Sequence, residues 1–247
     1  MTCEVAGPLG KSVSARMLVD GERESAVIEM AEAAGIGYSP CTESSALAAT
    51  TYGVGELMLR AVRTGAKTLY IGLGGSAAND GGAGMLQALG ARVVDDRGCD
   101  IAPGLAGLER VASVDLAPAL RALDGARIVV LSDVENPLVG RRGALAVFGG
   151  QKGLPTGDAE ALSRCDSWMV GYGRLLDTAI VEARARGCCA HPRAHGHLAR
   201  CSACPARALP VAWARRCWHS VRSYTRVWRR CSISWGLTNM CAMSTWS

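Results

Sequence analysis

The sequence lacks the usual marks of a membrane or secreted protein. None of its apolar runs is long enough to span a bilayer, and the N-terminus has no signal-peptide pattern. We therefore expect a cytoplasmic protein with no membrane partner. Internal repeats are also absent. The 247 residues, 49% of them hydrophobic and 30 of them Gly, fit an α/β protein with one large domain or two small ones.

Acidic residues are missing from the end of the chain. Residues 188–247 contain nine Arg but no Asp, Glu or Lys, a net charge of +9. Residues 1–187 contain 18 Lys and Arg against 22 Asp and Glu, a net charge of −4. The terminal segment also holds seven of the eleven Cys, all four His and five of the six Trp. This change predicts an α/β body over 1–187 and an irregular, disordered tail over 188–247.

Two functions can be considered for the tail. His191, His195 and His197 precede a Cys201-x-x-Cys204 pair, a spacing that can bind zinc. In a segment so rich in Cys and His such pairs arise by chance, so we expect no metal site. The arginines interleave with tryptophans, as in nucleic-acid-binding segments. The complete lack of acidic residues argues against a functional soluble surface, and we expect no nucleic-acid partner.

The body is organised around residues 68–89. An apolar run over 68–73 predicts a buried strand, and residues 83–89 predict a helix. A strand, a glycine-rich turn and a helix start together build an anion site, because backbone N–H groups and the helix dipole face the ligand. The turn between them contains Gly72, Gly74, Gly75, Ser76, Asn79, Asp80, Gly81, Gly82 and Gly84.

Two further polar clusters follow glycines or strand ends. A predicted buried strand over 127–131 leads to Asp133 and Asn136, and Gln151 and Lys152 lie in a glycine-rich segment. Phosphoryl transfer needs donors for a phosphate, carboxylates for Mg²⁺, a cation and a group that orients the hydroxyl, and these residue types match. Simpler alternatives remain open: Asp133 as a turn former and Lys152 as a solvated surface charge.

The start of a predicted helix over 56–64 is a further candidate. Thr50 and Thr51 precede it, and either they cap the helix or they form a second ligand-facing helix start beside the glycine-rich turn. The remaining expectations are coarse: two strands within residues 3–30, a loop over 35–45, a strand over 91–94, weak structure over 108–116, and a long helix over about 158–186 that Gly171 and Gly173 could interrupt.

A dinucleotide-binding oxidoreductase is the weaker alternative. Gly72-x-Gly74-x-x-Ala77 matches the G-x-G-x-x-A fingerprint, and Asp95 lies near the end of the next strand. The glycine-rich turn continues through residues 79–82, however, where the fingerprint requires a helix.

Six motifs of the body resemble those of the glycerate kinase family with the GGSATNDGG signature. The matches cover about residues 5–187 in the family's order: Gly7–Gly10, Ala26–Met30, Thr51–Leu57, Gly74–Gly82, Asp133–Leu138 and Phe148–Gly153. Ala78 stands where Thr is usual, Thr51 where Ser is usual and Gly150 where Pro is usual.

The resemblance implies two α/β domains with the active site between them, and this chain would keep mainly the inserted mixed α/β domain. It also implies transfer of the ATP γ-phosphate to a hydroxyl of glycerate with Mg²⁺. Catalysis would fall to Asp80, Asp133 and Lys152. Substrate or phosphate would contact Thr51, Gly74, Gly75, Ser76, Asn79, Gly81, Gly82, Asn136 and Gln151. The resemblance leaves the phosphorylated hydroxyl and the oligomeric state open.

The ends of the chain depart from the family pattern. The family's opening Asp-Ser-Phe-Lys and Ala-Asp-Gly-Gly-Glu-Gly-Thr motifs have no counterpart before Met1, and its later Thr-Gly-Glu-Gly motif is missing after residue 187. We interpret this as a chain truncated at the N-terminus, with a reading-frame shift near residue 187. Sequencing the gene across this point tests the hypothesis, which an error-free frame would refute. The non-enzymatic alternative is an inactive kinase fragment.

Overall fold

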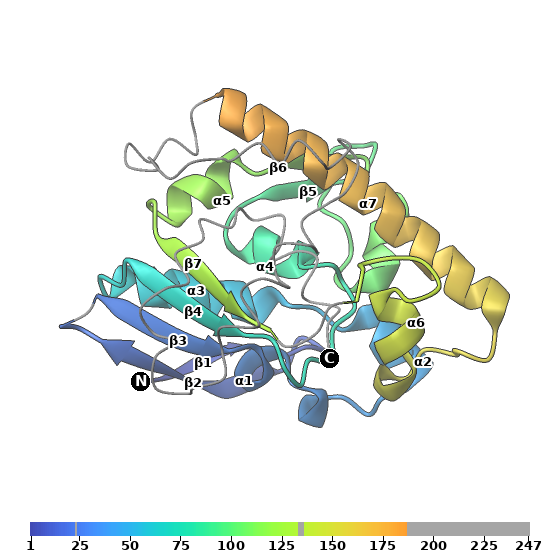
Figure 1. Cartoon of the computed structure of the whole chain (residues 1–247), viewed down its shortest axis with the longest axis horizontal. Coiled ribbons are helices and arrows are strands. Elements are labelled where there is room, and N and C mark those ends of the chain that lie inside the picture. The colour runs from blue at the N-terminus through green and yellow to red at the C-terminus, as the bar shows by residue number, and fades with distance from the viewer. Residues whose placement is uncertain (23, 133–135, 187–247) are drawn as a thin grey trace, which may run out of the picture.

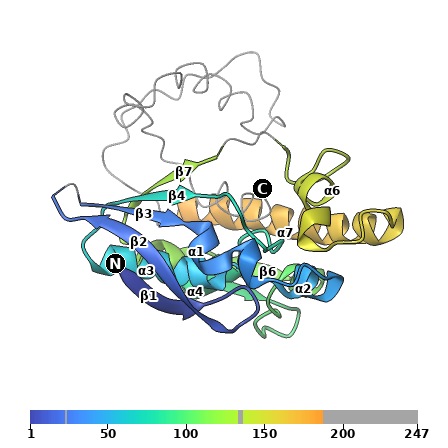
Figure 2. The ribbon, with the colours of Figure 1, turned by 90° about the horizontal axis from the view of Figure 1, so that it is seen from below.

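A five-stranded sheet in the order β1–β2–β3–β4–β7 positions the candidate site. The computed structural model describes residues 1–22, 24–132 and 136–186. The strands are β1 (Thr2–Ala6), β2 (Ser12–Asp20), β3 (Ser25–Glu29), β4 (Thr68–Gly72) and β7 (Arg127–Leu131). Figure 1 shows this sheet at the lower left, and Figure 2 shows the strand order from below.

The strand directions bring the carboxyl ends of three parallel strands to one edge of the sheet. β1, β2 and β3 pair antiparallel, whereas β3, β4 and β7 run parallel. Glu29, Gly72 and Leu131 are register partners at the ends of the three parallel strands. The carboxyl ends of β3, β4 and β7 therefore meet at one edge, where open α/β sheets bind ligands.

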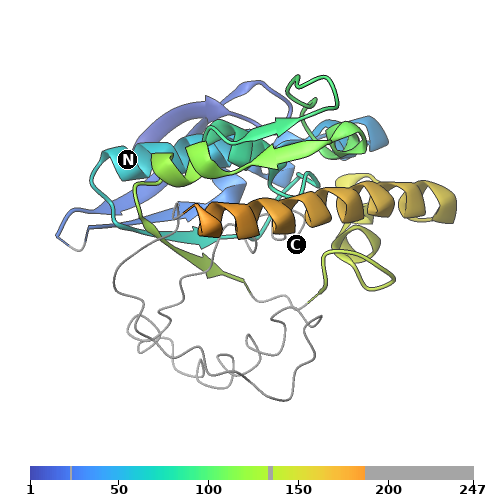
Figure 3. The same ribbon diagram turned by 90° about the horizontal axis from the view of Figure 1, so that it is seen from above.

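Helices pack on the sheet and on one another. The α-helices are α1 (Met30–Ala34), α2 (Glu43–Ala48), α3 (Tyr52–Arg63), α4 (Ala83–Ala88), α5 (Ala117–Ala122), α6 (Ala144–Phe148) and α7 (Ala159–Ala185). The short 3₁₀ helices are η1 (Ile36–Tyr38), η2 (Leu105–Arg110) and η3 (Gly150–Lys152), and β5 (Arg92–Val94) pairs with β6 (Ser113–Asp115). α1 and α3 contact the sheet, α3 packs along α4, and α7 contacts η2 and β6 (Figure 3).

One apolar core holds these layers together. Ile28 and Leu69 from the sheet, Leu57 of α3, Leu86 of α4 and Met169 of α7 are fully buried in it. Burial of apolar side chains from every layer is the main favourable term in such a fold. Residues 76–80 of the glycine-rich loop between β4 and α4 are also buried.

The structure confirms the predicted mixed α/β class and most elements of the body, with five differences. The first stretch of the chain forms three strands, β1, β2 and β3, where two were expected. α2 begins at Glu43, inside the expected loop, because Thr42 and Ser45 form a capping box. α3 begins at Tyr52, four residues before the predicted start. α7 continues through Gly171 and Gly173, since packing overrides the low helix propensity of Gly. β6 lies in the stretch from which only weak structure was expected, and α5, which follows it, was not predicted.

Other expectations concern residues outside those described. The predicted tail, its zinc-like residues and the boundary near residue 187 belong to this group. Among the residues that the structure describes, no helix combines the length and the apolar character needed to cross a membrane.

Candidate active site

The glycine-rich loop has an open end and a buried end. Gly74 and Gly75 are exposed directly after β4, and Gly75 adopts a φ of 73° that favours glycine. From Ser76 to Asp80 the chain is buried. Backbone bonds fix the turn between these ends, because Ile36 N donates to Gly75 O at 2.8 Å. The loop therefore offers a ligand its first glycines and directs the following residues inward.

Asp80 lies at the buried end, with a side chain that is 0% exposed. Its Oδ2 accepts hydrogen bonds from Thr50 Oγ1 at 3.2 Å, from Thr51 N at 2.8 Å and from Thr51 Oγ1 at 2.9 Å. Gly84 N also donates to Oδ2, at 3.2 Å, and Gly82 N donates to Oδ1, at 3.0 Å. Protein donors thus surround the carboxylate that the resemblance placed in catalysis.

Gly81 and Gly82 form the turn into α4. Both have left-handed φ values, 58° and 78°. Met169 and Tyr172 of α7 lie so close to Gly81 that an added Cβ would come within 3.0 Å of both side chains. α7 therefore covers this part of the loop. The N–H group of Gly82, expected to face a ligand, donates to Asp80 instead.

Thr51 joins two helix starts. It is the residue before α3, and its side chain makes no capping bond within that helix. Its Oγ1 donates to Asp80 and accepts from Met85 N of α4 at 3.0 Å. Thr51 is 0% exposed. The hydroxyl thus serves the contact between α3, α4 and the loop, an arrangement that neither of the two sequence-based alternatives described.

Lys152 is buried, contrary to the interpretation as a solvated surface charge. It belongs to η3, is 0% exposed, and donates from Nζ to Ala78 O at 2.8 Å. Desolvation lowers the pKa of this amine from 10.5 to about 7, and the negative charge of Asp80 partly opposes that shift. The segment after α6 is therefore bonded directly to the glycine-rich loop.

Ser76 and Asn79 point into the same interior. Ser76 Oγ accepts from Ala78 N at 3.1 Å, and Asn79 Nδ2 donates to Ala46 O of α2 at 3.2 Å. Both residues are 0% exposed. Asn79 Oδ1 is buried without a hydrogen-bond partner among the described residues. An unmet buried acceptor is uncommon in native proteins and is often associated with function.

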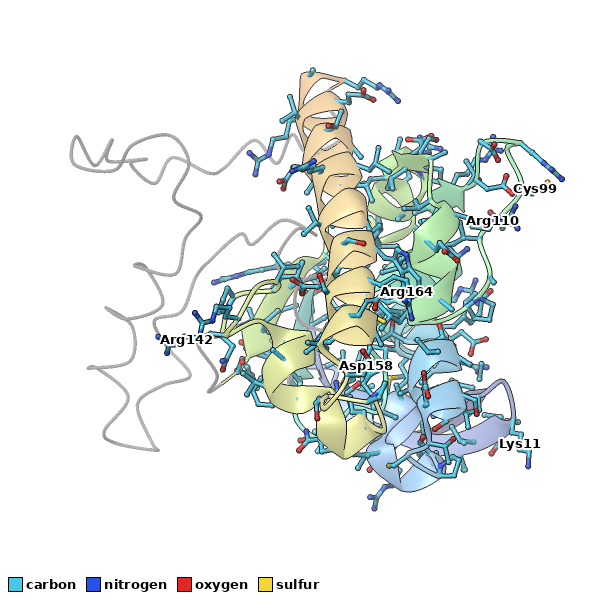
Figure 4. All side chains as sticks on the ribbon, turned by 90° about the vertical axis from the view of Figure 1, so that its right-hand side faces the viewer. Lys11, Cys99, Arg110, Arg142, Asp158 and Arg164 are labelled. Atoms are coloured by element: carbon cyan, nitrogen blue, oxygen red, sulfur yellow. The ribbon has the colours of Figure 1, made fainter. Side chains whose placement is uncertain are left out.

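Two other predicted residues, Asn136 and Gln151, are less buried. Asn136 is half-buried and donates from Nδ2 to Arg142 O at 3.0 Å, whereas Gln151 is exposed. Arg142 is labelled in Figure 4 beside α6, together with Asp158 and Arg164 at the beginning of α7. Asp133 lies outside the described residues. The glycine-rich loop and Lys152 therefore meet directly, while the placement of Asp133 remains a prediction.

A metal ion has no evident ligands in the part of the chain that is described. No group of three His, Cys, Asp or Glu side chains there could hold one. Asp80, the predicted carboxylate in this part, is already occupied by hydrogen-bond donors. We therefore derive no step through Mg²⁺ from the described residues.

Sequence reasoning missed one residue at the site and the contact made by another. Thr50 was considered as a helix cap or as part of a ligand-facing helix start, whereas its hydroxyl donates to the buried Asp80. Glu29 is exposed at the end of β3, and a Cβ at Gly72 would lie 3.6 Å from its carboxyl group. The signal for Glu29 was its place directly after a short apolar run, where carboxyl ends of strands supply ligand-facing side chains.

Comparison with known proteins identifies this arrangement. The model of the glycerate kinase family matches residues 1–191. The chain belongs to the glycerate kinase family. Glycerate kinase of Bacillus subtilis (strain 168) is 48% identical over 176 residues, covering 71% of this chain and 45% of that protein. Glycerate 2-kinase of Escherichia coli (strain K12) is 45% identical over 149 residues, 60% of this chain and 39% of that protein.

A solved structure agrees with the family assignment. The crystal structure of "putative glycerate kinase 2" from Salmonella typhimurium LT2 matches with a TM-score of 0.67 and 44% identity, covering 72% of this chain and 47% of that one. These matches confirm the resemblance and do not favour the dinucleotide-binding alternative. The chain spans less than half the length of these relatives.

Proposed function

We propose that this chain takes part in ATP-dependent phosphorylation of a hydroxyl of glycerate, with a cytoplasmic location where ATP is supplied. The observation that carries the proposal is the family's loop, Gly74–Gly82, which opens at the carboxyl edge of the parallel strands. Sequence identity of 48% to a glycerate kinase supports the same chemistry. The substrate class follows from the family, and ATP supplies the transferred phosphoryl group.

The open side of the site supplies the proposed ligand contacts. The exposed backbone at Gly74 and Gly75 would contact an anionic group of the substrate or nucleotide. The exposed Gln151 would donate to the same group. Glu29, at the neighbouring strand end, would orient the attacked hydroxyl. Mg²⁺ belongs to the proposal only through Asp133, because the described residues form no metal site.

Lys152 and Asn79 would act from the interior. The amine of Lys152 donates to the carbonyl of Ala78. It would therefore influence a bound phosphate by positioning the loop and not by direct contact. Asn79 Oδ1 keeps an unused acceptor beside the same loop. We propose that these residues maintain the loop conformation in which Gly74 and Gly75 bind.

The assay uses the purified full chain with ATP, Mg²⁺ and glycerate, and measures ADP release. We expect release that requires both substrates and disappears in Gly74→Leu. A Cβ at Gly74 would meet no atom within 4 Å, so we expect this variant to fold and its larger side chain to obstruct the open end of the loop. Circular dichroism of Gly74→Leu serves as the control for folding.

The second candidate is an inactive kinase fragment that binds substrate without turnover, favoured by the bonding of the Asp80 carboxylate to protein donors. Isothermal titration with glycerate and with ATP separates the two functions. Binding without ADP release supports the second candidate. Absence of binding and of turnover would refute both.

A further inference from the structure

Asp80 uses all of its acceptor capacity inside the protein. Five protein donors reach its two oxygens: the N–H and O–H groups of Thr51, the O–H of Thr50, and the N–H groups of Gly82 and Gly84. A carboxylate offers about two lone-pair sites on each oxygen. Gly82 N and the Thr51 hydroxyl, at 3.1 Å, reach Oδ1, and the remaining donors reach Oδ2, so neither oxygen keeps a site for a substrate hydroxyl. With 0% exposure, the side chain also has no surface that a ligand could touch.

The donors come from the beginnings of two helices. Thr51 precedes α3, Gly82 precedes α4, and Gly84 lies in the first turn of α4. The first N–H groups of a helix have no partner within the helix and form its positive end. One carboxylate therefore supplies acceptors and negative charge to both helix starts, in the interior where the contact is least screened.

The packing around Asp80 leaves no room for a different arrangement. A Cβ at Gly84 would overlap Thr50 Oγ1 and lie 2.9 Å from Asp80 Oδ2. A Cβ at Gly55 of α3 would come within 2.7 Å of the Ala88 side chain of α4. The two helices approach so closely only because glycine occupies these positions.

We propose that Asp80 is a positioning residue, an internal anion that joins the starts of α3 and α4 and thereby fixes the glycine-rich loop. The buried end of the loop is filled by this carboxylate, and ligand binding is confined to the open end at Gly74 and Gly75. Asp80 acts through the loop conformation and touches neither substrate. The confinement of ligands to the open end rests on the proposed function, whereas the role of Asp80 as a positioning residue does not.

The first experiment is rescue by an exogenous anion, with thermal unfolding of the full chain as the readout. Asp80→Gly leaves a cavity lined by donors, and we expect its Tm to fall by about 10 °C. Sodium formate at 200 mM should restore about half of that loss, while sodium chloride at the same concentration should not. Asp158→Gly is the matched control, since Asp158 also accepts from two backbone N–H groups at a helix start, but at the surface.

Comparison of Asp80→Gly with its control decides whether Asp80 acts as an internal anion. For the control we expect a fall of about 2 °C and no response to formate, because Gly is tolerated at an exposed helix start. An Asp80→Gly variant as stable as the wild type would overturn the proposal. Equal responses to formate and chloride would do the same, because ionic strength would then explain the gain.

The second experiment tests positioning against direct proton transfer. In Asp80→Asn we expect ADP release to fall at least about tenfold, while the pH–rate profile keeps the shape of the wild type. Loss of the acidic limb of that profile would show Asp80 to be the general base and refute its positioning role. If the wild type shows no turnover, the proposed function fails while the formate experiment still decides the role of Asp80.

Discussion

The buried and open halves of the glycine-rich loop differ in what holds them. At the buried end, Asp80 and Lys152 are 0% exposed and bonded to other segments of the chain. At the open end, Gly74 and Gly75 are exposed, and a Cβ at Gly74 would meet nothing within 4 Å. One sequence motif thus contains glycines required by packing and glycines available to a ligand.

The difference separates stability from binding. Changes at the buried end should lower the free energy of unfolding, because they leave cavities, clashes or unpaired polar groups. Changes at the open end should leave folding intact and alter affinity. Three comparisons test this division.

The largest expected effect comes from a matched pair of glycines. Gly84→Ala should lower the free energy of unfolding by about 3 kcal/mol, because the added methyl group overlaps Thr50 Oγ1. Gly74→Ala should change it by less than about 0.5 kcal/mol. Urea denaturation of the two variants and the wild type measures both values.

Equal stabilities for the two alanine variants would contradict the division. A loss in Gly74→Ala as large as that in Gly84→Ala would show that the open end is also fixed by packing. Glycerate titration of Gly74→Ala gives the complementary measurement, since we expect weaker binding there despite normal folding.

The next effect is a dependence of stability on pH through Lys152. Burial lowers its pKa to about 7 in the folded chain, below the 10.5 of the exposed amine. Between these values the unfolded chain binds a proton that the folded chain has lost. The free energy of unfolding should therefore rise with pH by up to about 1.4 kcal/mol per unit.

Lys152→Met removes this contribution. Denaturation at pH 7, 8 and 9 should show a flatter dependence in Lys152→Met than in the wild type. Lys67→Met is the control, because Lys67 is exposed and paired with Glu24 at the surface, and it should keep the wild-type slope. If Lys152→Met kept the wild-type dependence of stability on pH, that dependence could not be assigned to Lys152.

The smallest effect on stability is expected at Gln151. Its side chain is exposed, so Gln151→Ala should change the free energy of unfolding by no more than about 0.5 kcal/mol. Nucleotide and glycerate titrations should instead show several-fold weaker binding of one of the two ligands. Unchanged affinity for both would remove Gln151 from the proposed site.

The sequence allowed the loop to be located and the strand before it to be predicted. Apolar runs and glycine clusters are local signals, so β4, β7 and α7 could be read from them. The inward direction of Asp80 could not, because it depends on Thr50 and Thr51, about thirty positions earlier in the chain. The burial of Lys152 likewise follows from its distant partner, the carbonyl of Ala78.

Ala78 illustrates the same limit. It stands where the family pattern has Thr, so it has no hydroxyl to offer a ligand. In the structure its side chain is 0% exposed and packs with Ala49 and Ala77 against Ile36. A contact of this kind joins segments separated by about thirty residues, so local patterns cannot reveal it.

The hydroxyl of Thr51 has a fixed direction of hydrogen bonding. It accepts a hydrogen bond from Met85 N and donates one to Asp80, so the hydrogen bonds lead in one direction from α4 through the hydroxyl to the carboxylate. A side chain at this position must both donate and accept a hydrogen bond, which Ser and Thr can do and Val cannot. A Ser at this position, as in the family pattern that the sequence resembles, would therefore differ by one methyl group and keep the chemistry of the position.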